Sequence, residues 1–206
     1  MRVAAPLAVS DAAVRLAVIG KLGWIKRQQA RFAAQPRLSP RELVGGESHT
    51  VFGRRYRLRV VPSVGVAEVV LRPGLRLELH ISADASLARR ERVLKAWYRE
   101  KLKARVPTLL EKWQPLLGVE AVAWGIRKMK TRWGTCNVEA RRIWLNLELA
   151  HKLPQCLEYI LVHELAHLIE RTHNDRFVAL MNRHLPQWRL RRQQLNAAPL
   201  AHENWN

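Results

Sequence analysis

Residues 163–173 read HELAHLIERTH, and most of what the sequence predicts follows from this stretch. It sets His163, Glu164 and His167 within five consecutive residues of one expected helix. A third histidine, His173, follows six residues later. Two imidazoles four residues apart project from the same helical face and can bind one ion, while a carboxylate beside the first can reach a water in the ion's open position. The pattern therefore predicts a zinc (Zn2+) site that carries its own general base.

The helix around these residues is mostly apolar, which indicates that it is buried. A polar strip inside a buried helix is unfavourable unless it has partners, and a bound metal supplies them. The competing interpretation, two solvated histidines on a surface turn, is disfavoured by the apolar neighbours. These neighbours are Leu157, Ile160, Leu161, Val162, Leu165, Leu168 and Ile169.

The third ligand is assigned to His173 because it lies in a break after the helix, from which its ring can turn back toward the metal. Thr172 or Asn174 can cap the following helix, whose apolar residues include Phe177 and Met181. The metzincin class has the same histidine spacing, but its pattern requires a glycine where this chain has Glu170. We therefore reject that class.

Three other side chains compete for the metal or support it. Glu170 lies three residues after His167, and Asp175 lies near the expected start of the next helix. Either is alternatively a residue that supports the ligands or a plain surface charge. Cys136 could provide a thiolate ligand instead of an imidazole.

The composition is that of a globular protein. The 206 residues are 48% hydrophobic and 26% charged, which is enough for a full core. Two cysteines, Cys136 and Cys156, are too few for a disulfide framework and favour a reducing compartment. Because neither a convincing signal peptide nor a membrane span is visible, we expect a cytoplasmic protein without a membrane partner.

The chain is strongly basic, with 36 Lys and Arg against 17 Asp and Glu and a net charge of +19. The basic residues are spread along the chain, which favours a basic surface on a folded domain that attracts nucleic acid or an acidic protein. The competing interpretation is an arginine-rich surface that binds nothing specifically. The sequence makes no prediction about oligomeric state.

The first half of the chain changes its hydrophobic period once. Residues 11–34 have helical spacing that begins near Asp11, and from residue 50 the period becomes two, with a turn at residues 72–74. This pattern predicts an antiparallel sheet with one solvated face. A long helix then follows, capped by Asp84, and Pro107 marks a kink or a restart.

Two further strands are expected at residues 122–129 and 143–149, joined through residues 132–136 and a polar turn near Asn137. The second leads through Pro154 into the helix with the histidines. A strand beside that helix would suit a peptidase, because its free edge can bind an extended substrate.

Three segments resemble a known family, the YgjP-like group of small bacterial zinc metallopeptidases, which is related to the SprT-like and Wss-type zinc proteases. These segments are TRWGTC at residues 131–136, IWLNLELAHKLP at residues 143–154, and EYILVHELAHLIERTHNDRFVALMNRHLPQW at residues 158–188. The resemblance covers residues 46–195, including GESHTVFGRRYRLRV at residues 46–60, and is strongest over residues 130–188. It implies His163, His167 and His173 as zinc ligands and Glu164 as the catalytic carboxylate.

The fold class expected is α+β. The resemblance implies a compact zincin fold in which a small antiparallel or mixed sheet packs on the active-site helix. We divide the chain into an N-terminal helical extension (residues 1–45), an antiparallel strand segment (46–82), a zincin catalytic core (83–195) and a C-terminal tail (196–206). Residues 46–195 are expected to form one domain, and the tail, with His202, to be an untethered terminus.

The function predicted is hydrolysis of peptide bonds in a protein or peptide substrate. Zinc held by three neutral imidazoles lowers the pKa of its water and polarises the substrate carbonyl, and Glu164 takes the proton of that water and passes it to the leaving amine. By residue type, Arg132, His151, Tyr159 and His184 are each candidates to stabilise the oxyanion, and the sequence does not choose among them. Trp133 is interpreted as packing, whereas Asn146 is either structural or part of the site.

Two functions of other classes remain open. A metal-dependent ribonuclease of the YbeY-like type has three histidines at the same offsets and would suit a basic protein, but its motif lacks the glutamate beside the first histidine. A nucleic-acid-binding module with a structural zinc would need four protein ligands, and the cysteines offer no obvious fourth. Combining the features, the basic surface predicts a peptidase that acts on nucleic-acid-associated proteins.

Overall fold

A computed structural model describes residues 3, 5–6, 8–34 and 42–197 of the chain. The chain divides into two units, Met1–Ser39 with Pro199–Asn206, and Pro40–Ala198. Most of the expected C-terminal tail, including His202, lies outside the described residues.

The first unit contains two helices, α1 (Asp11–Gly20) and α2 (Leu22–Ala34), where the sequence predicted helical structure over residues 11–34. The cap of α1 is Ser10, whose hydroxyl oxygen accepts a hydrogen bond from the backbone N–H of Ala13 at 3.3 Å. The predicted cap near Asp11 is therefore displaced by one residue, and Lys21 separates the two helices.

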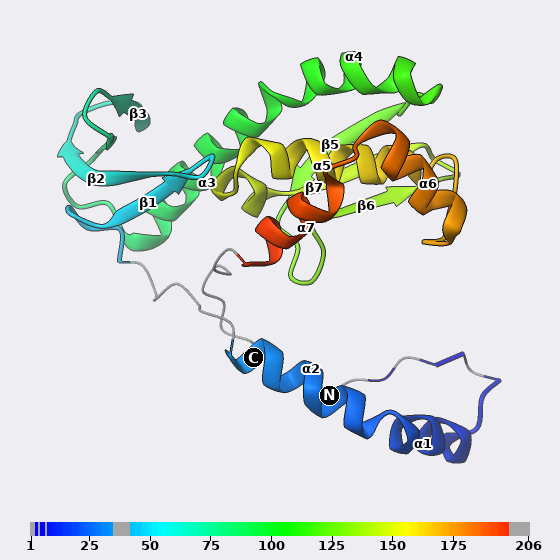
Figure 1. Cartoon of the computed structure of the whole chain (residues 1–206). Helices are drawn as coiled ribbons and strands as arrows, with labels where there is room; N and C mark the ends of the chain where they lie inside the picture. Colours follow the sequence, from blue (N-terminus) through cyan, green and yellow to red (C-terminus); the bar gives the residue numbers. More distant parts are fainter. Residues whose placement is uncertain (1–2, 4, 7, 35–41, 198–206) are drawn as a thin grey trace. The chain divides into compact units, whose positions relative to one another are not determined.

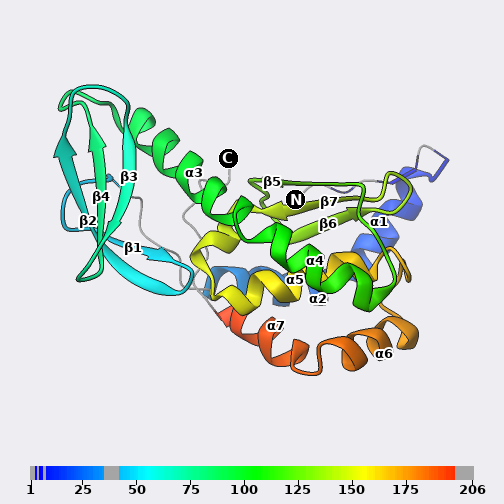
Figure 2. The ribbon, with the colours of Figure 1, turned by 90° about the horizontal axis from the view of Figure 1, so that it is seen from above.

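The second unit begins with a four-stranded sheet in the order β1-β2-β4-β3 (Figures 1 and 2). Phe52 and Gly53, both with positive φ, make the tight turn between the first two strands. A second hairpin joins β3 to β4 at the predicted turn, residues 72–74. The strands are β1 (Ser48–Val51), β2 (Arg54–Pro62), β3 (Glu68–Arg72) and β4 (Arg76–Ile81).

The expectation of a wholly antiparallel sheet is wrong for one pair, because β2 and β4 run parallel. β3 returns along the outer edge of β4 and leaves β4 between itself and β2. Alternating hydrophobicity determines which face of a strand is buried, but it does not determine which strand lies beside it. The sequence pattern therefore could not distinguish this order from a simple meander.

Two helices follow, α3 (Leu87–Lys103) and α4 (Val106–Leu117). The cap of α3 is Ser86, which accepts from the N–H of Arg89, and not Asp84 as predicted. The Asp84 carboxylate instead accepts a hydrogen bond from the Ser82 hydroxyl. Pro107 lies in the first turn of α4 and so marks a restart, which was one of the two predicted outcomes.

The second sheet has three strands, β5 (Ala123–Arg127), β6 (Gly134–Asn137) and β7 (Arg142–Asn146), in the order β5-β7-β6. β7 runs parallel to β5 and antiparallel to β6. The sequence analysis treated residues 132–136 as a connection, so it missed β6. Its four residues, GTCN, show no alternation of apolar and polar side chains that would predict a strand.

A 3₁₀ helix, η1 (Leu147–His151), leads from β7 into α5 (Pro154–Ala166), which is buried on nearly all sides. α5 packs against β6 and β7 of the three-stranded sheet and also against α4, α6 (Asp175–His184) and α7 (Trp188–Ala197) (Figures 1 and 2). The α+β fold class is confirmed, and one small mixed sheet packs on this helix as expected. No helix in the described part of the chain has the length and apolar character needed to cross a lipid bilayer.

Candidate functional site

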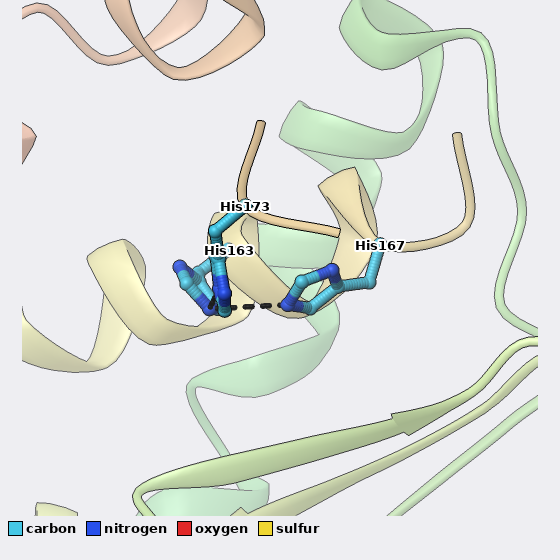
Figure 3. A group of neighbouring side chains, drawn as sticks. All are labelled: His163, His167 and His173. Atoms are coloured by element: carbon cyan, nitrogen blue, oxygen red, sulfur yellow. Dashed lines mark hydrogen bonds between the residues drawn. The ribbon is translucent and has the colours of Figure 1, made fainter. Parts of the chain in front are cut away.

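Three histidines converge at the end of α5 (Figure 3). His163 lies in the last turn of α5, His167 is its C-cap residue, and His173 lies in the loop before α6. The Nε2 atom of His163 is 3.2 Å from Nε2 of His167 and 3.0 Å from Nε2 of His173. The structure thus brings together the three histidines that the sequence proposed as ligands.

These separations fit a tetrahedral metal ion. Two imidazole nitrogens bound to zinc at about 2.0–2.1 Å with tetrahedral angles lie roughly 3.4 Å apart. One His163 nitrogen facing two other ring nitrogens can donate a proton to only one of them, so a purely hydrogen-bonded cluster leaves lone pairs opposed. A cation at the centre resolves this conflict, and three protein ligands leave a fourth position open.

The protonation states of the rings suit metal binding. Burial, together with the neighbouring rings of His167 and His173, lowers the pKa of His163 to about 3. Burial also lowers the pKa of His167. Both rings are therefore neutral near pH 7, and neutral imidazole is the form that binds a metal.

The loop and the following helix hold the rings in place. The Nδ1–H of His167 donates to the backbone carbonyl oxygen of Glu170 at 3.0 Å, which leaves the lone pair on Nε2 for a metal. Phe177 packs against all three imidazole rings, with centroid separations of 4.8 to 5.0 Å. Asn174 caps α6 through the N–H of Phe177, as one of the two predicted caps, and so places that ring.

The competing ligands lie outside the converging group, which is the one such group among the described residues. The Glu170 carboxylate accepts hydrogen bonds from the backbone N–H and the hydroxyl of Thr172 and so braces the loop. Asp175 begins α6 and is exposed. The Cys136 thiol lies near Glu164, and burial together with the Glu164 carboxylate raises its pKa to about 11.

Glu164 lies beside the histidines and is only 5% exposed. Burial raises the pKa of its carboxyl to about 8, and the nearby Arg132 guanidinium partly opposes that rise. The backbone of β6 passes directly over this carboxyl. A Cβ atom added to Gly134 would lie 2.5 Å from Oε1 and 2.7 Å from Cγ of Glu164, so the contact tolerates no side chain at this position.

The group opens into a pocket of about 850 Å³ between β6, α5 and α7. Of the four candidate oxyanion donors, Arg132 and Tyr159 line this pocket. His151 and His184 are not among its lining residues. The Nδ1–H of His151 instead donates to the carbonyl oxygen of Thr50 at 2.8 Å, far from the histidine group in the fold.

Two further arginines, Arg171 and Arg192, also line the pocket, and the sequence analysis did not place them there. It read them only as part of the general positive charge. Arg171 lies between His167 and His173 in the sequence, so its closeness to the two histidines could have predicted its place in the pocket. Arg192 is brought in by the packing of α7 on α5, which no local pattern predicts.

Trp133 is partly buried against the hydrophobic core and lines the pocket wall, in keeping with the packing role expected for it. Asn146 is 4% exposed and does not line the pocket. Its side-chain Nδ2 instead donates a hydrogen bond to the backbone carbonyl oxygen of Arg132.

The chain is similar to one protein family and to solved metallopeptidase structures. The sequence matches the family described as "YgjP-like, metallopeptidase domain" over residues 1–198. The metallopeptidase zymogen of Pyrococcus abyssi abylysin is similar with a TM-score of 0.41 and 25% identity, over 44% of this chain and 90% of that chain. The metallopeptidase zymogen of Methanocaldococcus jannaschii jannalysin is similar with a TM-score of 0.39 and 18% identity, over 44% and 95%. No curated protein matches the sequence.

Proposed function

Because the chain belongs to the YgjP-like family of metallopeptidases, we propose that it is a zinc peptidase whose ligands are His163, His167 and His173. Glu164 serves as the general base. The observation that carries this proposal is the approach of three imidazole Nε2 atoms to one another beside a buried carboxyl, at the wall of an open pocket.

The donor set favours zinc. Imidazole nitrogen suits zinc, and three protein ligands with an open fourth position are typical of catalytic rather than structural zinc. When bound, zinc supplies a Lewis acid that lowers the pKa of a coordinated water and polarises the substrate carbonyl. This openness also disfavours the alternative of a binding module with a structural zinc.

Glu164 moves the proton. In the proposed reaction its carboxylate accepts a proton from the attacking water and then donates it to the leaving amine nitrogen. Burial alone favours the protonated carboxyl, as the raised pKa shows. A divalent cation held by His163 and His167 favours the carboxylate, so metal binding prepares the base.

Tyr159 and Arg132 are the proposed donors to the oxyanion that develops on the substrate carbonyl. Both line the pocket, on α5 and on the loop before β6. Burial raises the pKa of Tyr159, which keeps its hydroxyl protonated and able to donate. Its ring also meets the His163 ring edge-on, with centroids 5.9 Å apart.

The edge of β6 is the proposed binding site for an extended peptide. β6 pairs with β7 on one side, and within the described residues no strand pairs with its other side. Its first residue, Gly134, lies against Glu164. A peptide that adds to this edge would therefore pass beside the catalytic carboxyl.

The proposed action on nucleic-acid-associated proteins depends on the net charge of +19 alone. The ribonuclease alternative is disfavoured by family membership and by Glu164, which stands where the YbeY-like motif has no glutamate.

Metal removal tests the proposed function. The purified protein is treated with a chelator and then given one equivalent of zinc, with unstructured peptides and an RNA as parallel substrates. We expect cleavage of the peptides to be lost with the chelator and restored by zinc, while the RNA stays intact. RNA degradation that follows the zinc, without peptide cleavage, would contradict the proposal.

Gly134→Ala is expected to lower kcat/KM for peptides by at least about 10-fold, because the added methyl group displaces either Glu164 or the edge strand. Zinc stoichiometry should not change, since no ligand moves. The matched control is Gly45→Ala, where an added Cβ meets no atom within 4 Å. Equal activity of the Gly134→Ala protein and the parent would show that the close approach is not needed.

A further inference from the structure

The segment at residues 128–133 has an unusual path, because it must cross the end of a strand. β5 and β6 lie on opposite sides of β7, and this segment joins them. Arg127, the last residue of β5, pairs with Asn146, and Gly134, the first residue of β6, pairs with Leu145. The segment therefore passes over the carboxyl end of β7, where Asn146 lies.

Asn146 binds this crossing segment through every polar group of its side chain. Its Nδ2 donates to the carbonyl oxygens of Met129 at 2.9 Å and Arg132 at 2.7 Å. Its Oδ1 accepts from the backbone N–H of Met129 at 3.3 Å and of Glu148 at 3.2 Å. The backbone N–H of Asn146 also donates to the carbonyl oxygen of Trp133 at 2.9 Å.

These hydrogen bonds satisfy backbone groups that have no partner in a β-sheet. A segment that skips a strand has no ladder to satisfy its N–H and C=O groups, and a buried unsatisfied group costs about 1–3 kcal/mol. Asn146 is 4% exposed, so its bonds form away from water, where a lost partner is not replaced. No other common side chain of this size offers two donors and an acceptor in one plane.

A second contact lies on the same segment. The Lys152 ammonium group lies 5.3 Å from the centre of the Trp133 ring, and Lys152 is only 6% exposed. Lys152 follows η1, the element that begins with the turn capped by Asn146. Both contacts therefore join the crossing segment to the connection between β7 and α5.

The crossing segment leads directly into the site. Arg132 and Trp133 line the pocket, and Gly134 meets the Glu164 carboxyl. We infer that Asn146 is a positioning residue. It holds the segment at residues 128–133 in place, and this fixes the positions of Arg132 and of the start of β6 beside Glu164. It touches neither the metal group nor the pocket. The inference rests on the proposed use of β6 as the substrate edge.

Asn146→Asp tests the inference with almost no change in shape. The substitution replaces Nδ2 by an oxygen that faces two carbonyl oxygens at 2.7 and 2.9 Å, so attraction becomes repulsion. We expect kcat/KM for an extended peptide to fall about 10- to 100-fold, chiefly through KM. Zinc stoichiometry and inhibition by a small zinc-chelating hydroxamate, which needs no strand edge, should stay at the parental values.

The matched control is Asn182→Asp, the same chemical change on α6. The Oδ1 of Asn182 only accepts, from the Nε1–H of Trp188 and from Arg189, so an aspartate keeps both bonds. Asn182→Asp should retain parental kcat/KM. A peptide kcat/KM within about twofold of the parent for folded Asn146→Asp would overturn the inference, as would an equal loss of peptide and hydroxamate binding.

Hydrogen exchange supplies a test that depends neither on activity nor on the fold of a variant. In the parent protein the Met129 amide should be protected, because it donates to Asn146. Exchange of this amide at the rate of an unstructured chain would overturn the inference. If the parent cleaves no peptide, the proposed function fails but the exchange result still decides the role of Asn146. If Asn146→Asp does not fold, Asn146→Ser, which retains one donor, should lose protection at residues 128–134 and cleave with an intermediate kcat/KM.

Discussion

Glu164→Gln is expected to lower kcat for peptide cleavage by about 10²- to 10⁴-fold while the protein keeps one zinc per chain. Glutamine keeps the size of the side chain and its buried position but cannot accept a proton from water. The three imidazole ligands are unchanged, so elemental analysis should give the parental zinc content. The matched control is Glu111→Gln on α4, an exposed glutamate outside this pocket, which should cleave at the parental rate.

The same variant should be at least as stable as the parent, which separates lost chemistry from lost folding. In the metal-free protein the pKa of Glu164 is raised by burial from 4.5 to about 8. The folded state then binds more protons than the unfolded state between these values, so the free energy of unfolding of the parent falls as the pH rises from about 4.5 to about 8. Glutamine does not titrate, so the free energy of unfolding of the variant does not fall for this reason over the same pH range.

Denaturant unfolding of both metal-free proteins measures whether Glu164→Gln is more or less stable than the parent. The advantage of Glu164→Gln over the parent should grow between pH 5 and pH 8, reach a few kcal/mol, and level off at higher pH. A variant that is less stable than the parent at pH 8 would mean that the loss of cleavage has a folding explanation, and the assignment of Glu164 as the base would lose its support.

His173→Ala is expected to abolish both zinc binding and peptide cleavage. His173 supplies one of three Nε2 atoms, and its removal should weaken zinc binding by more than the roughly 10- to 100-fold that the loss of a supporting hydrogen bond costs. Because His173 is exposed and lies in a loop, the metal-free variant should unfold at the parental temperature. Titration with zinc, with the thermal midpoint as the readout, measures both effects.

The control for this experiment is His184→Ala, a histidine on α6 that does not line the pocket. It should bind zinc and cleave peptides as the parent does. A His173→Ala protein that retains one zinc with parental affinity would exclude His173 as a ligand and reopen the assignment to Glu170 or Cys136.

Helix α5, which carries His163 and Glu164, is the part of the fold that the sequence predicts best. Pro154 starts α5 as expected, and the apolar residues before His167 are buried as the pattern indicated, whereas Leu168 and Ile169 are partly buried. Asn174 was one of two expected caps for α6. These features depend on contacts between residues that are close in the chain, and such contacts leave a signature in residue type and spacing.

The caps and strands that were predicted wrongly show where local patterns lose their value. Asp84 and Ser86 are both good caps by type, and only the observed start of α3 selects Ser86. β6 has no alternation, because a four-residue edge strand with a glycine beside Glu164 is shaped by its neighbours and not by a half-buried surface of its own. The parallel pairing of β2 and β4 is likewise a property of strand order.

By itself, the sequence determined the α+β class, the family and the spacing of the histidines and the glutamate, since each of these is recorded in residue types a few positions apart. Only the tertiary structure decided that Gly134 lies against Glu164, that Arg192 enters the pocket, and that Asn146 holds the segment that crosses β7. Gly134 and Glu164 are 30 positions apart, and Asn146 and Arg132 are 14 positions apart. At such separations, the packing of whole strands and helices determines which side chains meet, and no local period records it.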